Sequence, residues 1–100
     1  MELKERYPKN WIKEGLEVAH YDNPKKKLFV SKIVKEKILI RGELKNRLKC
    51  IKCYWHEEIN NGEKSMIYSD FFSTHLVPYE VGIEGKELID KFRNRFADDY

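Results

Sequence analysis

The residues best suited to chemistry stand together in the stretch LKCIKCYWHEE, residues 48–58. Cys50 and Cys53 are three positions apart, and His56 follows three positions later. Thiolates and imidazoles are preferred ligands of zinc. One interpretation is therefore a zinc site formed by Cys50, Cys53, His56 and His75, with His20 as a further imidazole. The other is a β-strand that carries two thiols.

Strand geometry separates these interpretations. Residues three apart in a strand project from opposite faces, with Cα atoms about 10 Å apart. That separation exceeds the reach of a disulfide and cannot place both sulfurs on one zinc ion. Zinc-binding cysteine pairs also usually sit in tight turns, whereas Ile51 and Lys52 separate these two. We therefore expect free thiols, no metal and no cofactor, with Ile51, Cys53 and Trp55 facing the core.

The rest of the chain offers no catalytic motif. We find no Gly-x-Ser-x-Gly elbow, no glycine-rich phosphate loop and no His-Glu-x-x-His helix. Ser73 and His75 lie close to Asp70 in sequence, but polar residues near a strand end are ordinary at the rim of a sheet. We expect a protein that acts by binding and has no enzymatic activity.

Charge is distributed unevenly along the chain. The total is +3, yet residues 25–52 contain eleven Lys or Arg and two Glu, a net charge of +9. Such a block is typical of a polyanion-binding surface, and equally of lysines that solvate the outer faces of strands. If the segment binds phosphates, the candidate ligands are Lys25, Lys26, Lys27, Lys32, Lys35 and Lys37.

The elements that must position these residues are mostly β. Alternating apolar residues and turn signals predict strands at 16–20, 27–35, 37–41, 47–57, 65–72 and 74–79, with a polar loop at 42–47. Asn61-Gly62 predicts a tight hairpin turn. The apolar positions shift phase between Val30 and Ile33, which a β-bulge would explain. Helical spacing of apolar residues predicts an amphipathic helix at 84–98.

Length and composition fit one domain. The chain has 100 residues, of which 41% are hydrophobic, enough for a packed core. We expect an N-terminal extension at 1–14, a small SH3-like antiparallel β-barrel at 15–79 and the helix at 84–98. The absence of an apolar leader or spanning segment, together with two unpaired thiols, favours a cytoplasmic protein without membrane contact.

The Cys-x-Trp strand resembles the signature of the small bacterial YodC-like proteins, an uncharacterised family. The match covers about residues 15–78, and the tail helix lies outside it. This chain departs from the pattern in the turn HYDN and in an apparent insertion between residues 33 and 51. The resemblance implies an SH3-like barrel without catalytic activity. Its matching residues are Gly15, Val18, Pro24, Leu28, Val30, Ile33, Cys53, Trp55, Phe72, Leu76 and Pro78.

Two functions stay open. A small barrel can mediate protein interaction or self-association, with an unknown protein partner or a second copy of the chain. The alternative is low-specificity binding of RNA or DNA through the lysine-rich segment 25–52. A helix this short must dock on a surface, and we expect that surface to be its own barrel, with another subunit as the alternative.

Overall fold

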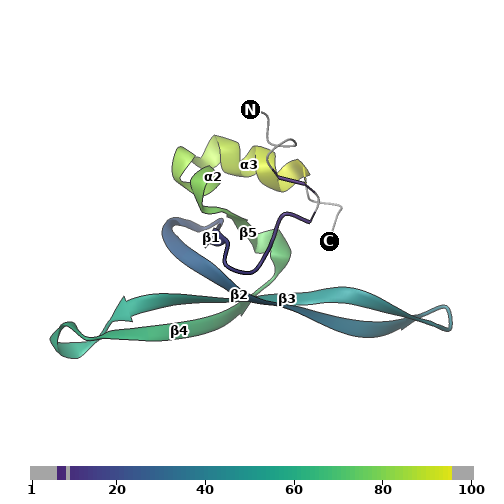
Figure 1. Cartoon of the computed structure of the whole chain (residues 1–100). Coiled ribbons are helices and arrows are strands. Elements are labelled where there is room, and N and C mark those ends of the chain that lie inside the picture. Colours follow the sequence, from purple (N-terminus) through teal and green to yellow (C-terminus); the bar gives the residue numbers. More distant parts are fainter. Residues whose placement is uncertain (1–6, 9, 96–100) are drawn as a thin grey trace.

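The computed structural model describes residues 7, 8 and 10–95 as one antiparallel sheet with helices on one side (Figure 1). The strand order is β4-β3-β2-β1-β5, so β4 and β5 form the two edges and the sheet is open. The mainly β architecture with a C-terminal helix is as expected, whereas a closed barrel is not confirmed. The elements are β1 (Glu17–His20), β2 (Asn23–Ile40), β3 (Glu43–Glu58), η1 (Asn60–Gly62), β4 (Lys64–Phe71), η2 (Ser73–His75), β5 (Leu76–Pro78), α2 (Tyr79–Glu84) and α3 (Lys86–Arg95).

Two long strands dominate the sheet. β2 has 18 residues and β3 has 16, and they pair from Phe29↔Tyr54 to Ile40↔Glu43. The predicted separate strand at 37–41 and polar loop at 42–47 are therefore wrong. The chain reverses at Arg41 and Gly42, whose φ angles are 51° and 82°. Positive φ at both central residues is the geometry of a two-residue type I′ hairpin turn, which glycine adopts without strain.

A β-bulge in β2 produces the predicted phase shift. Val30 pairs with Cys53, but the next pair is Lys32 with Lys52, which leaves Ser31 as an extra residue. The bulge lets Ile33 turn toward the same side of the sheet as Val30. A second shift, between the pairs of Val34 and Lys35, leaves an extra residue in β3. The prediction of a bulge between residues 30 and 33 is confirmed.

The connection between β3 and β4 is longer than predicted. The Asn61-Gly62 pair lies inside the short helix η1, and Asn61 has a φ of 65°. The Ile59 amide donates to the Glu63 carbonyl at 2.6 Å and closes this loop. The expected tight two-residue turn is therefore a broader loop around the same dipeptide.

The core lies between the sheet and the helices. Val18, Leu28 and Val30 project into it together with Ile51 and Cys53, all at most 2% exposed. α3 contributes Ile89 and Phe92, and the N-terminal segment contributes Tyr7, Trp11 and Ile12. Tyr7, Trp11 and Ile12 are thus part of the folded unit, although the sequence pattern had placed them in an extension.

An aromatic cluster joins the N-terminal segment to α3. The Phe92 ring meets the Trp11 ring edge to face at 5.1 Å and the Tyr7 ring at 5.5 Å. The predicted docking of the tail helix on its own sheet is confirmed, because Ile89 and Phe92 are buried there. The predicted helix at 84–98 corresponds to α3, whereas α2 was not predicted. Gly85, whose φ is 127°, separates the two helices, and residues 96–98 lie outside the described part.

The described molecule is elongated, with extents of 55 × 31 × 19 Å. Two arms extend from the central body in opposite directions (Figure 1). One arm ends at η1, between β3 and β4. The other is the far part of the β2–β3 hairpin, residues 35–48, which we call the ribbon. No helix in the described part of the chain is both long and apolar enough to cross a bilayer.

Candidate nucleic-acid interface

The ribbon concentrates cations on a hairpin that extends away from the body and touches the core only at its base, where Leu48 packs against it. Among the described residues, its one ion pair joins Arg47 to Glu36, and the Arg47 Nε donates to the carboxylate at 3.0 Å. The remaining cations have no carboxylate partner within the described part of the chain. The ribbon carries five basic residues (Lys35, Lys37, Arg41, Lys45 and Arg47) against two acidic ones (Glu36 and Glu43), a net charge of +3.

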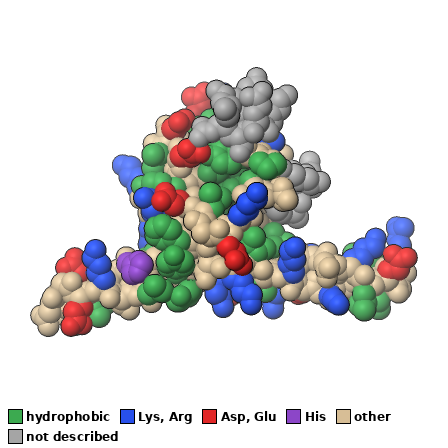
Figure 2. Space-filling view, viewed as in Figure 1, with side chains coloured by type: hydrophobic (Ala, Val, Ile, Leu, Met, Phe, Trp, Pro, Cys, Tyr) green, Lys and Arg blue, Asp and Glu red, His purple; other side chains and the backbone are tan. Residues whose placement is uncertain are grey.

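These cations lie on both faces of the ribbon. Lys35 and Lys37 alternate with Glu36 along β2 and share the face of Ile33, because successive residues of a strand project to opposite sides. Lys45 and Arg47 project from the other face. Blue side chains line the corresponding right-hand arm in Figure 2. An anionic ligand that approached either face of the ribbon would therefore meet cations.

The tip of the ribbon also carries exposed apolar side chains. Leu39 and Leu44 pair directly across the two strands, and they are 68% and 71% exposed. Ile40 adds a third exposed apolar side chain beside the turn. Adjacent exposed apolar side chains are a distinct surface feature, because contiguous exposed apolar patches can mark interaction sites.

The structure spreads the six predicted lysines over two regions. Lys32, Lys35 and Lys37 lie along the hairpin, whereas Lys25, Lys26 and Lys27 lie at the start of β2. The Lys27 Nζ is 3.6 Å from the Glu17 carboxylate and 4.9 Å from the centre of the Tyr79 ring. The six lysines therefore do not form one patch.

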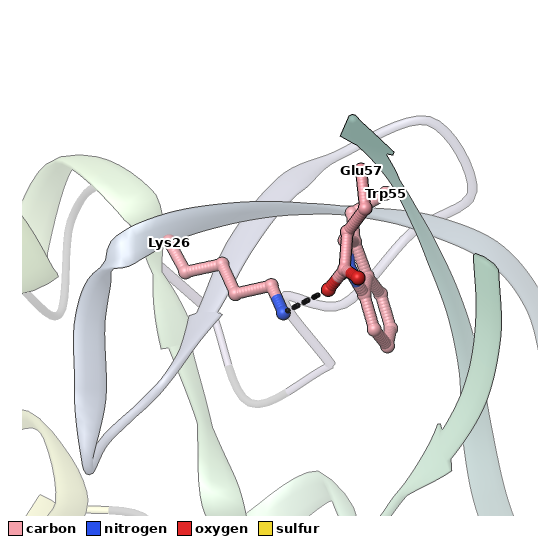
Figure 3. A network of polar contacts seen from close by, with 3 residues as sticks. All are labelled: Lys26, Trp55 and Glu57. Atoms are coloured by element: carbon pink, nitrogen blue, oxygen red, sulfur yellow. Dashed lines mark hydrogen bonds and ion pairs between the residues drawn. The ribbon is translucent and has the colours of Figure 1, made fainter. Parts of the chain in front are cut away.

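Lys26 is held by a local network (Figure 3). Its Nζ lies 3.2 Å from Glu57 Oε1 and 4.2 Å from the centre of the Trp55 ring. The Trp55 Nε1 donates to the same oxygen at 2.7 Å. The hydrogen bonds from Trp55 and from Lys26 both lower the pKa of Glu57. Lys26 thus has a carboxylate partner already, which weakens its case as a phosphate ligand.

A second candidate surface, a row of aromatic side chains, was not predicted from the sequence. Phe29, Tyr54 and Tyr68 lie side by side on β2, β3 and β4, with the pairs Phe29↔Tyr54 and Tyr54↔Tyr68. They project from the face of the sheet opposite the core, which we call the outer face. The alternation along β3 already placed Tyr54 opposite Cys53. Its neighbours on the other strands required knowledge of the pairing.

The cysteines are placed as predicted. Cys53 is buried beside Val30 and Ser69, and Cys50 is half-buried, and neither forms a disulfide. Burial raises the pKa of the Cys53 thiol to about 12, and the Asp70 carboxylate acts in the same direction. Ile51 is also buried, and Trp55 packs against the core. Within the described residues, no three His, Cys, Asp or Glu side chains lie close enough to hold a metal ion.

One hollow of about 300 Å³ lies at the bend of β2. His20, Trp55 and Phe71 contribute to its wall. Burial lowers the pKa of His20; Asp22 opposes this shift, and His75 and Arg93 reinforce it. Ser73 is buried, and His75 makes ring contacts with His20, Tyr21 and Phe72. No hydrogen bond joins the Ser73 and His75 side chains in the described part of the chain.

Comparisons of the chain with family models, with curated proteins and with solved structures find no match. The resemblance to the YodC-like proteins therefore stays a prediction. Inferences about function rest on the ribbon, the outer face and their charges.

Proposed function

We propose that the protein binds nucleic acid with low sequence selectivity and that the ribbon is its main phosphate-contacting element. The observation that carries this proposal is the ribbon itself: a two-stranded hairpin with cations on both faces that extends away from the packed core. From Lys35 to the turn at Arg41 it spans about 20 Å at roughly 3.3 Å per residue. That length is enough to follow several phosphates along a strand.

The shape of the ribbon agrees with the shape of the ligand. The major groove of B-DNA is wide enough to admit a two-stranded β-ribbon. Cations that face away from each other then approach the two phosphate backbones that flank the groove. Three of the ribbon cations, Lys35, Lys37 and Lys45, are lysines, which supply point charges without a fixed planar geometry. Binding would therefore be mainly electrostatic and tolerant of sequence.

Binding, with no catalytic step, is the simplest account of the described residues. The buried side chains form a packed core, and the ribbon cations Lys35, Lys37, Arg41, Lys45 and Arg47 are exposed. The strand order supports a further proposal, that the sheet is an open form of an SH3-like barrel, because β5 returns beside β1 and β2 bends at its bulge. The free thiols support a reducing compartment such as the cytoplasm.

Fluorescence anisotropy with labelled 20-base-pair DNA and a matched RNA duplex tests the proposal across a salt series from about 50 to 200 mM. The variant Lys35→Gln/Lys37→Gln/Lys45→Gln removes three ribbon cations. The matched control Lys64→Gln/Lys86→Gln/Lys91→Gln removes the same charge from exposed positions on β4 and α3.

The expected result is a linear fall of log affinity with log salt whose slope decreases by about 0.9 for each lost phosphate contact in the ribbon variant. The control variant should keep the wild-type slope. Equal losses in both variants would show that net charge alone drives binding. Absence of binding at 50 mM salt would overturn the proposal.

Self-association through the ribbon tip is a second candidate, favoured by the exposed Leu39–Leu44 pair. Contact between the tips of two chains would remove these leucines from water. Sedimentation velocity of the wild type and of Leu39→Ser/Leu44→Ser distinguishes this candidate. A concentration-dependent dimer that the double substitution abolishes would support it, and a monomer at all concentrations would exclude it.

A further inference from the structure

Three aromatic rings form a continuous row across the outer face. The Phe29 and Tyr54 ring centres are 5.3 Å apart and nearly parallel, at 23°. The Tyr54 and Tyr68 centres are 5.8 Å apart at 42°. Each ring comes from a different strand, so the row runs perpendicular to β2, β3 and β4. The core-facing neighbours Val30 and Cys53 are almost fully buried, which places the row on the side away from the helices.

The row is accessible. Tyr68 is 53% exposed, and Phe29 and Tyr54 are only partly buried. Neither tyrosine hydroxyl forms a hydrogen bond within the described part of the chain. Cross-strand aromatic pairs do stabilise sheets. The extent of this row, with its outer end open to solvent, also makes it a surface on which a planar ligand can stack.

Next to the row lies a pair of like charges. Lys32 and Lys52 are direct cross-strand partners, and Lys52 precedes Tyr54 by two residues on the same face. Like charges opposite each other destabilise a sheet. The carboxylate nearest in register is Asp70, opposite Lys52 on β4, and no ion pair joins them.

On the other side of the row the charge is already balanced. Lys27 lies two residues before Phe29 and pairs with Glu17 at 3.6 Å. An anion would therefore bind beside the row near Lys32 and Lys52, where it relieves the repulsion between two ammonium groups. A ligand that matches this surface has a planar ring to stack on the row and an anionic group to bind the lysines. A nucleotide in an unpaired strand has both.

We infer that the outer face is a stacking platform for unpaired bases of single-stranded nucleic acid, with its phosphates beside Lys32 and Lys52. This inference rests on the proposed nucleic-acid function and names the strand type that the sheet itself binds. The aromatic row receives the bases, because any base has a π face and stacking tolerates any sequence. The ribbon, which begins just beyond Lys32 and Val34, extends the same strand's phosphate contacts away from the body.

The test compares a labelled twelve-nucleotide oligo(dT) with a DNA duplex at 50 mM salt. The variant Tyr54→Leu/Tyr68→Leu keeps apolar bulk and removes the rings. Tyr54→Phe/Tyr68→Phe keeps the rings and removes the hydroxyls. Phe72→Leu is the matched control, because Phe72 is an exposed aromatic residue (64%) outside the row. Circular dichroism and thermal melting establish that each variant is folded.

We expect the leucine variant to bind oligo(dT) about 5- to 150-fold more weakly for each base that loses its stacking partner. Its affinity for the duplex should change less than threefold, and the phenylalanine variant and Phe72→Leu should bind as the wild type does. Unchanged oligo(dT) affinity in the folded leucine variant would overturn the inference.

The two proposals fail in different ways. If the ribbon variant loses salt dependence and the leucine variant binds normally, the outer-face inference fails and the ribbon function stands. If only the leucine variant loses affinity, the ribbon assignment fails and the stacking platform stands. If neither nucleic acid binds at 50 mM salt, both are overturned.

Discussion

The contact between Phe92 and the N-terminal segment makes a strong prediction about stability. Phe92 is 1% exposed and meets Trp11 and Tyr7 edge to face at 5.1 and 5.5 Å. Truncation of a buried Phe to Ala typically costs about 3–5 kcal/mol, through lost burial and the cavity that remains. Two well-placed aromatic pairs, each contributing about 0.5–1.5 kcal/mol, place Phe92→Ala near the upper end of that range.

Such a loss is a large fraction of the stability of one domain, about 5–15 kcal/mol. At roughly 4–8 °C per kcal/mol for a domain of this size, the melting temperature should fall by about 16 °C or more. Urea unfolding followed by tryptophan fluorescence measures the change directly. Phe92→Leu fills part of the cavity but removes both aromatic pairs, so it should cost about 1–3 kcal/mol, less than Phe92→Ala. Leu39→Ala at the exposed ribbon tip should stay within about 0.5 kcal/mol.

A double-mutant cycle locates the interaction. Substitution of Trp11 and Phe92 by Leu, singly and together, should give a coupling free energy of about 0.5–1.5 kcal/mol. A loss below about 1 kcal/mol for Phe92→Ala, with no coupling to Trp11, would refute the packing of Tyr7 and Trp11 against α3. The N-terminal segment would then lie outside the cooperative core.

Further predictions concern titration and the hairpin. At pH 8 in the native state, only Cys50 should react with a thiol reagent, because burial raises the pKa of Cys53 to about 12 and the thiolate is the reactive form; two fast thiols would contradict its burial. Because the pKa of His20 is lowered in the native state, the unfolded state binds more protons as the pH drops through about 6.5. The urea concentration at the unfolding midpoint should therefore decrease when the pH is lowered from 7.5 to 5.5, and His20→Gln should make that decrease smaller. Gly42→Val should strain the turn, where φ is 82°, and hydrogen exchange should show lost protection in the ribbon with unchanged core amides.

The sequence predicted well where one face of a strand is buried. Ile51, Cys53 and Trp55 follow the period of two and face the core, and the shift between Val30 and Ile33 is a bulge. Burial on one side forces apolar residues onto alternate positions. The helical spacing of Ile89 and Phe92 is equally clear because that helix also buries one side.

Prediction failed where neither face is buried. The segment 42–47 was interpreted as a loop because polar residues fill it, yet polar residues are expected in a ribbon with solvent on both sides. The turn at Arg41 and Gly42 lacks the usual Asn-Gly or Asp-Gly signal, so nothing marked the reversal. Of the candidate site, the lysines were identifiable by composition, whereas the row of Phe29, Tyr54 and Tyr68 depends on the register of three strands.

The ribbon also determines which insertions into the sequence this protein can tolerate. Its turn contains two residues, and none of the described helices packs on it, so insertion of two residues into each strand would lengthen it by about 7 Å without disturbing the core. Insertion of a single residue into one strand would instead exchange the side chains of its two faces. The length of the ribbon can thus change without a change in the side chains on each face. The ribbon is therefore a site where the length can be adjusted or a foreign sequence grafted.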